Sequence, residues 1–186
     1  MQRQSPAMVL KEVGMDLREK KTQKSIRNAF LQIRARKDLG KITVKELASA
    51  AEISKATFYL HYRDIYDLSE KMQSEVIRDV LEGIGRPELF FHDKAQFLDE
   101  FVQSFYAKKS MIDILFGGTE NGILALSIER EMKDYLIKMN PDLQDDAEFN
   151  TRFTYWVMGG FYAFWENTKR FSTEEIIKTL KAMVRE

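Results

Sequence analysis

Hydrophobic residues recur at spacings of three and four along most of the chain, with polar residues between them. This spacing places apolar side chains on one face of an α-helix, whereas a half-buried strand would alternate every second residue. No convincing alternating run occurs, and glycine and proline stand between the periodic runs, with Gly159-Gly160 as the exception. The pattern therefore predicts an all-α protein.

About nine helices are expected from these runs and from the breaks between them. The breaks are glycines, prolines and short polar residues, which are typical of helix ends. The expected helices cover about residues 21–37, 44–51, 55–62, 65–82, 94–107, 109–116, 121–139, 144–168 and 173–185. The segment Gly83-x-Gly85-x-Pro87 is the best candidate for a boundary between two parts of the chain.

Short polar residues stand where the second, third and fourth helices should begin. Thr43 followed by Glu46 at the third helical position forms a capping box. Ser54 and Asp64 can cap the helices that follow them. Two short helices joined by a tight turn at 51–54 are typical of a helix-turn-helix.

The stretch ISKATFYLHY, residues 53–62, mixes hydrogen-bond donors with residues that are suited to burial. Phe58 and Tyr62 are expected to anchor this helix on the two helices before it. The other side chains are slim or can reach a phosphate, as a helix in a major groove about 12 Å wide requires. Base edges are contacted from the beginning of such a helix. The pattern predicts a surface that binds double-stranded DNA.

The segment TVKELASAAEISKATFYLHYRDIYDL resembles the DNA-binding domain of the TetR family of transcriptional regulators, a resemblance that covers about residues 20–75. The segment FTYWVMGGFYAFWENTKRFSTEEI weakly resembles the closing segment of a TetR subgroup common in Gram-positive bacteria. The resemblance implies a nine-helix subunit, a homodimer and a C-terminal domain that senses a ligand. It implies base contacts by Lys55 and Ala56, and phosphate contacts by Thr43, Ser54, Thr57, Tyr59 and His61.

Two positions depart from the family pattern. Glu52 occupies the turn position that is often glycine in the family, and a left-handed backbone costs a non-glycine residue roughly 1 kcal/mol. Its carboxylate would also lie near the DNA phosphates. Ile65 stands where many members have a lysine that contacts the DNA backbone, and we expect the neighbouring Arg63 to substitute.

The net charge is zero but unevenly distributed. Residues 1–71 hold 15 Lys and Arg against 9 Asp and Glu, a net charge of +6, and residues 72–186 hold 14 against 20, a net charge of −6. The basic N-terminal segment is suited to binding a polyanion. A chance imbalance between solvated helix faces would give the same distribution of charge.

Cysteine is absent, which excludes disulfides, thiol catalysis and thiolate metal sites and fits a reducing cytoplasm. No membrane-spanning segment or export signal is evident. We therefore expect a cytoplasmic protein without a membrane partner. Met15 could be an alternative start, which would make residues 1–14 a dispensable tail.

The sequence contains no evident catalytic or metal-binding set. His92 has no partner histidine, and Glu129, Glu131 and Asp134 are not accompanied by the repeated Glu-x-x-His pairs of helical di-iron sites. The glycine-rich run at 116–122 is not followed by the Lys-Ser/Thr of a phosphate loop. We expect no enzyme activity, no cofactor and no metal.

The segment 144–168 is apolar on two faces, which predicts two partners: its own domain and a second subunit. A helix buried within a monomer would give the same pattern. The predicted dimer interface comprises Phe149, Phe153, Trp156, Gly160 and Phe164. A pocket for an apolar ligand is predicted from Phe97, Phe101, Phe105, Met111, Phe116 and Tyr155, which core packing explains equally well.

We interpret the chain as a ligand-responsive repressor that binds a palindromic DNA operator as a homodimer. The expected organisation is an N-terminal extension over 1–19, a helix-turn-helix DNA-binding domain over 20–65, and a C-terminal regulatory and dimerisation domain over 66–186. The effector is an unknown small molecule or protein. The alternative is a protein-binding transcriptional co-activator or adaptor on the same fold.

Overall fold

The structure is a computed structural model that describes residues 6–167 and 170–183. These residues are almost entirely helical and contain no strand, which confirms the predicted all-α class. The chain divides into two compact units, Met1–Met72 and Gln73–Glu186, here called unit 1 and unit 2. The division falls within helix α4 (Ile65–Glu82), which therefore contributes residues to both units.

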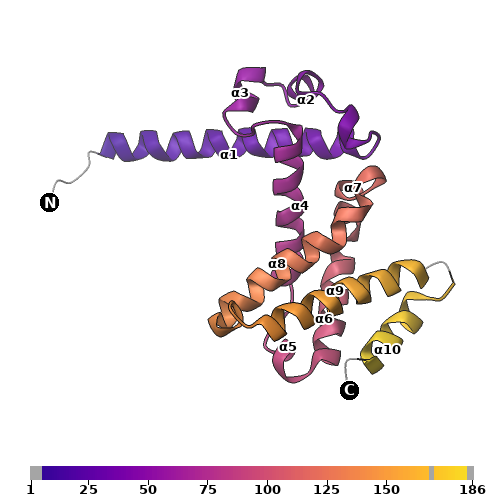
Figure 1. The fold of residues 1–186 in the computed structure, drawn as a ribbon. Coiled ribbons are helices and arrows are strands. Elements are labelled where there is room, and N and C mark those ends of the chain that lie inside the picture. The colour runs from indigo at the N-terminus through magenta and orange to yellow at the C-terminus, as the bar shows by residue number, and fades with distance from the viewer. Residues whose placement is uncertain (1–5, 168–169, 184–186) are drawn as a thin grey trace. The chain divides into compact units, whose positions relative to one another are not determined.

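Unit 1 contains helices α1 (Pro6–Arg34), α2 (Val44–Ala50) and α3 (Lys55–Tyr59), the short 3₁₀ helix η1 (Leu39–Lys41) and the first part of α4 (Figure 1). Helix α1 begins well before the predicted start at residue 21. The prediction relied on buried apolar positions, which start at Ile26, whereas the preceding residues include several strong helix formers. The core of the unit is formed by Ile26, Phe30, Leu47, Phe58 and Leu68, all fully buried.

The predicted helix caps of unit 1 are confirmed. Each capping side chain accepts a hydrogen bond from a backbone N–H that the first helical turn leaves without a partner. The bonds run from Glu46 N to Thr43 Oγ1 at 3.2 Å, from Thr57 N to Ser54 Oγ at 3.0 Å, and from Asp67 N to Asp64 Oδ1 at 2.8 Å. These caps fix where α2, α3 and α4 begin.

Unit 2 contains the rest of α4 and the helices α5 (Leu89–His92), α6 (Lys94–Ala107), α7 (Lys109–Leu115), η2 (Gly118–Ile123), α8 (Leu124–Met139), η3 (Pro141–Leu143), α9 (Ala147–Asn167) and α10 (Thr173–Met183). The five long helices match the predicted ones within a few residues, and the predicted ends at 168 and 185 lie outside the described residues. Helices α5, η2 and η3 were not predicted because they are too short to show a hydrophobic period.

An aromatic cluster forms part of the core of unit 2. The ring of Phe90, in the short helix α5, is buried and contacts rings from α6 and α9 edge to face, a favourable geometry for aromatic pairs. Its ring centroid lies 5.4 Å from that of Phe97, 5.9 Å from Phe153, 6.0 Å from Trp156 and 6.4 Å from Phe149. This cluster determines which side of α9 faces inward.

Candidate nucleic-acid interface

The turn between α2 and α3 has the geometry that the sequence predicted. Glu52 has a φ of 56°, and it is the one non-glycine residue with positive φ in the described part of the chain. Its backbone N–H donates to Ser49 O at 3.2 Å, and Ile53 N donates to Ala48 O at 3.0 Å, which closes the end of α2. A glutamate therefore holds the left-handed conformation that glycine adopts most easily.

Hydrogen bonding also fixes this turn to α1. The hydroxyl of Ser25 donates to the backbone carbonyl of Ala51, the last residue before Glu52, at 2.9 Å. The bond satisfies a carbonyl at the end of α2 that has no partner within that helix. The turn is consequently held against one defined face of α1.

Helix α3 presents one face to the core and the other to solvent. Phe58 and Tyr62 are buried with ring centroids 5.7 Å apart, as predicted for the anchoring residues. Lys55 and Ala56 are exposed, and the side chain of Tyr59 is 56% exposed. The exposed face thus carries a cation, a small residue and a phenol, a slim surface of the kind that fits a major groove.

The seven predicted DNA contacts lie at the start of α2 and along α3. Thr43 and Ser54 are exposed cap residues, and Thr57 and His61 are half-buried. The hydroxyls of Ser54 and Thr57 are hydrogen-bonded to each other at 2.8 Å. Both side chains already have a local role in helix capping, whereas Lys55, Ala56 and Tyr59 remain available to a partner. Contact with DNA stays a prediction for all seven.

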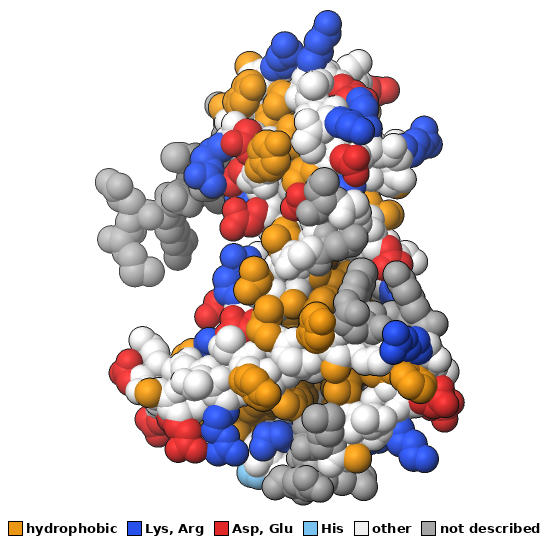
Figure 2. All heavy atoms as spheres, turned by 45° about the vertical axis from the view of Figure 1, so that its right-hand side comes forward, with side chains coloured by type: hydrophobic (Ala, Val, Ile, Leu, Met, Phe, Trp, Pro, Cys, Tyr) orange, Lys and Arg blue, Asp and Glu red, His pale blue; other side chains and the backbone are white. Residues whose placement is uncertain are grey.

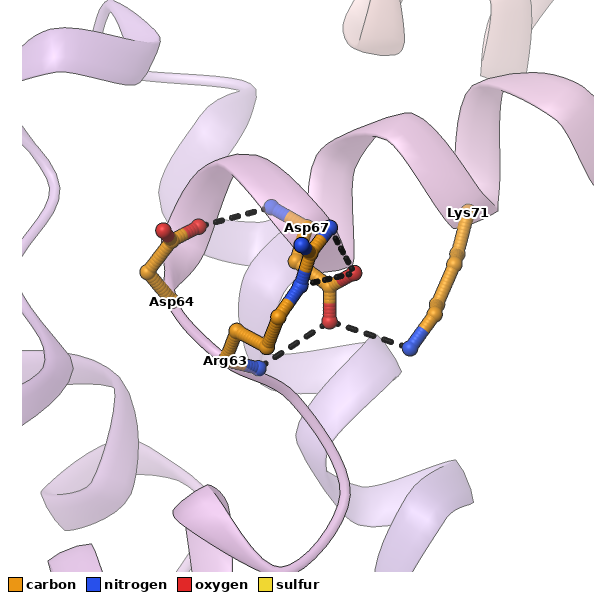
Figure 3. A network of polar contacts seen from close by, with 4 residues as sticks. All are labelled: Arg63, Asp64, Asp67 and Lys71. Atoms are coloured by element: carbon orange, nitrogen blue, oxygen red, sulfur yellow. Dashed lines mark hydrogen bonds and ion pairs between the residues drawn. The ribbon is translucent and has the colours of Figure 1, made fainter.

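A carboxylate holds Arg63 at the start of α4, a contact that sequence reasoning missed (Figure 3). Asp67, whose side chain is 7% exposed, accepts from the backbone N–H of Arg63 at 3.0 Å and pairs with its guanidinium at 3.2 Å. Lys71 Nζ lies 3.0 Å from Asp67 Oδ2, the oxygen that also accepts from the Arg63 N–H, whereas the guanidinium pairs with Oδ1. The spacing of four residues between Arg63, Asp67 and Lys71 was the available signal.

Burial alone would raise the pKa of Asp67, but the hydrogen bonds from Lys71 and from the backbone and side chain of Arg63 outweigh it and hold the pKa below its ordinary value. Asp67 therefore stays ionised at neutral pH. Arg63 remains largely exposed and can offer its charge to a partner, whereas Ile65 is uncharged and buried. Figure 2 shows further Lys and Arg side chains at the end of unit 1 formed by α2 and α3.

Unit 2 contains a separate apolar cavity of about 130 Å³ between α6, α8, α9 and α10. Three residues of the predicted pocket, Phe97, Phe101 and Phe105, line it. The other three lie elsewhere: Phe116 is buried in the core, Met111 is partly exposed, and Tyr155 is 82% exposed. The remaining lining includes Ile128, Met132, Trp156, Val157, Phe161, Ile177 and Leu180, with no charged residue.

The predicted dimer residues lie on the inward side of α9. Phe153 is 3% exposed within the single chain, Phe149 and Trp156 contact Phe90, and Gly160 and Phe164 line the apolar cavity. The opposite side carries the exposed residues Tyr155, Gly159 and Tyr162, and Figure 2 shows hydrophobic side chains exposed on unit 2. Homodimerisation stays a prediction.

Two α8 carboxylates that could have indicated an acid–base or metal site, Glu129 and Glu131, are paired with other side chains of the chain. Glu129 accepts from Lys133 at 2.5 Å and from the hydroxyl of Thr154 at 2.6 Å, which ties α8 to α9, and Glu131 pairs with Arg78. Within the residues described, no group of three or more His, Asp or Glu side chains could hold a metal ion.

None of the described helices has both the length and the apolar character needed to cross a membrane.

Comparison with known proteins finds a relative for part of the chain. It is 29% identical over 89 residues to the uncharacterized HTH-type transcriptional regulator YxbF of Bacillus subtilis (strain 168). The match covers 47% of this chain and 22% of that protein, so the chain spans about a fifth of the curated relative's length. No protein-family model matches the chain, and no solved structure matches it significantly.

Proposed function

We propose that this chain is a helix-turn-helix transcriptional regulator that binds double-stranded DNA through α3. Two sequence similarities support the proposal. The sequence is similar to part of a protein named an HTH-type transcriptional regulator. The segment 43–68 also resembles the DNA-binding domain of TetR regulators, and on this basis we assign the chain to that type of regulator.

The observation that carries the proposal is the two-sided character of α3. Phe58 and Tyr62 anchor the helix in the core, while Lys55, Ala56 and Tyr59 point to solvent. In a major groove, Lys55 would donate to a base edge, Ala56 would permit close approach, and the hydroxyl of Tyr59 would donate to a phosphate. Arg63, held by Asp67 at the start of α4, would add a phosphate contact on the flank.

We further propose that the regulator acts as a homodimer on a palindromic operator. A two-fold protein places two recognition helices on half-sites about 34–36 Å apart. The outward side of α9, with Tyr155, Gly159 and Tyr162, is the surface best suited to the second copy, because a glycine between exposed aromatic residues permits close approach of another helix.

The apolar cavity of unit 2 is the proposed effector site. Its volume is close to that of an engineered apolar cavity of about 150 Å³ that binds benzene. A small uncharged apolar molecule, or an apolar group of a larger one, would therefore fit. Effector binding would favour a conformation in which the two recognition helices have the wrong spacing, so that operator affinity falls and repression ends. Helix α4 contributes to both units and is the element that such a change would involve.

The alternative is a co-activator or adaptor whose partner is another protein, for which the acidic composition of residues 72–186 leaves room. An enzymatic role is not proposed, because the α8 carboxylates are occupied by Lys133, Thr154 and Arg78. A regulator of chromosomal DNA would act in the cytoplasm.

The test is selection of bound sequences from a random duplex library, followed by a gel shift with the selected duplex and with the DNA upstream of the gene. The expected result is a palindromic consensus bound at least a hundredfold more tightly than random duplex. A Lys55→Glu variant should lose this preference, whereas the matched change Lys138→Glu at an exposed position of unit 2 should keep it. Failure of the native protein to bind any duplex at low salt would reject DNA binding and favour the adaptor.

A further inference from the structure

The N-terminal part of α1 carries cations that the fold of unit 1 does not use. Among the described side chains of this helix, which start at Leu17, the first buried one is Ile26. Leu17 is 62% exposed, and Arg18, Lys21 and Lys24 are all exposed. In Figure 1 this part of α1 continues past α2 and α3. Residues 17–24 therefore extend the helix without contributing a buried side chain.

The spacing of these cations places them on the face of α1 that holds the turn of the helix-turn-helix. Lys21 and Arg18 precede Ser25 by four and seven residues, so the three side chains share one face of the helix. Ser25 on this face donates to Ala51 at the turn between α2 and α3. Arg18 and Lys21 consequently continue, along α1, the face against which that turn is held. Lys24 lies next to this face, and we call Arg18, Lys21 and Lys24 the α1 ridge.

Among the described residues, no carboxylate pairs with the charges of the α1 ridge. Residues 18–27 hold five cations and one acid, Glu19. Other cations of unit 1, such as Lys37, Arg63 and Lys71, are paired with carboxylates. The described part of the chain offers no such pair to the three cations of the ridge. Like charges three and four residues apart destabilise a helix slightly, so the ridge does not serve the stability of the fold.

We propose that the α1 ridge binds the sugar-phosphate backbone of duplex DNA on the flank of the site that α3 contacts. This inference rests on the proposed function and adds to it a sequence-independent contact outside the recognition helix. From residue 18 to residue 24 the helix rises about 9 Å, and duplex DNA carries one phosphate charge per 1.7 Å or so of its axis. Two or three phosphates of one strand are therefore within reach of the ridge. DNA is the partner that fits best because the ridge continues from the face that holds the turn before α3.

The experiment compares the full-length native protein with the triple variant Arg18→Gln, Lys21→Gln, Lys24→Gln. A control with the same loss of charge is Lys138→Gln, Arg170→Gln, Lys178→Gln, at exposed positions of unit 2. Affinity for the selected duplex is measured from 50 to 300 mM salt. Each lost phosphate contact lowers the slope of log affinity against log salt by about 0.9, so the triple variant should lose about 2–3 in slope. The ratio of specific to non-specific affinity should stay unchanged because the lost contacts carry no sequence information.

A second measurement uses a duplex trimmed to the consensus itself. Trimming should weaken binding of the native protein and of the control several-fold but should barely affect the triple variant, whose flank contacts are already lost. An unchanged salt slope in the triple variant, or an equal fall in the control, would overturn the inference while leaving the proposed function intact. If thermal unfolding shows that the triple variant is destabilised, Lys21→Gln alone replaces it, with an expected loss of about 0.9 in slope. Absence of DNA binding by the native protein would instead reject the proposed function.

Discussion

Replacing Glu52 should separate the effect of backbone strain from the effect of charge at the turn before α3. Glu52 has a φ of 56°, so Glu52→Gly should relieve strain of about 1 kcal/mol. Glycine also gives the unfolded chain more freedom, which costs about 0.5–1 kcal/mol. The two terms nearly cancel, and the free energy of unfolding should change by less than about 0.5 kcal/mol. Urea unfolding at pH 7 measures this change.

The charge of Glu52 should act on the proposed DNA affinity rather than on folding. A carboxylate about 10 Å from a phosphate in water experiences a repulsion of about 0.4 kcal/mol, which corresponds to about a twofold change in affinity. Salt screens this repulsion over about 30 Å at 0.01 M and about 10 Å at 0.1 M. The matched variant Glu52→Gln removes the charge and keeps the strained backbone. It should bind DNA about twofold more tightly at low salt and no more tightly than the native protein at high salt.

Comparing the DNA affinities of Glu52→Gly and Glu52→Gln separates the effect of turn geometry from the effect of charge. Fluorescence anisotropy with the selected duplex at 0.02 and 0.3 M salt would show whether Glu52→Gly matches Glu52→Gln or exceeds it. A gain of Glu52→Gly over Glu52→Gln that persists at high salt would mean that the turn geometry limits binding. Equal affinity of both variants and the native protein at low salt would refute the reasoning, because it would place the Glu52 carboxylate away from the DNA.

Five further substitutions test other parts of the structure. Lys55→Ala and Tyr59→Phe should each weaken operator binding, with about 1–3 kcal/mol lost for a base contact, while circular dichroism stays native; unchanged affinity of both at matched salt would exclude α3 as the recognition helix. Gly159→Arg, on the outward side of α9, should convert a dimer into a monomer in sedimentation while circular dichroism stays helical, and a native protein that sediments as a monomer at micromolar concentration would reject the dimer. Phe153→Ala should lower the free energy of unfolding by about 3–5 kcal/mol in urea titration, because it removes a buried ring of the aromatic cluster, and a loss below 1 kcal/mol would contradict that packing. Because the folded-state pKa of Asp67 is below the ordinary value of 3.8, its stabilising contribution is present above about pH 4 and is lost as the pH falls through the folded-state value, so Asp67→Asn should reduce the difference in stability between pH 7 and pH 3.

The hydrophobic period predicted the long helices because their burial follows directly from the spacing of apolar residues. The caps at Thr43, Ser54 and Asp64 were equally readable, since each needs only one side chain and a nearby backbone N–H. Helix α1 was predicted too short, because the prediction relied on the spacing of apolar residues, and the first buried apolar residue described in this helix is Ile26. The left-handed turn at Glu52 was predicted only through the family pattern, since the residue itself gives no such signal.

The sides of α9 could not be assigned from the sequence. Both sides are apolar, and a period distinguishes an apolar side from a polar one but not an inward side from an outward one. The inward side of α9 is defined by the short helix α5, because the buried ring of Phe90 packs against Phe153 and Trp156. The same difficulty explains why the pocket was predicted only in part: Phe101 and Phe105 line the cavity, but Tyr155 faces solvent.

The division of the chain within α4 has a consequence for synthesis on the ribosome. Unit 1 ends at Met72, so the helix-turn-helix is complete before the 114 residues of unit 2 have been translated. Its short helices make mostly local contacts, which favours folding in microseconds to milliseconds. At about 5–20 residues per second, translation of unit 2 takes about 6–23 s. During that interval each nascent chain has a complete helix-turn-helix but lacks unit 2, so under the proposed function the DNA-binding surface would form before the effector cavity and the dimer surface.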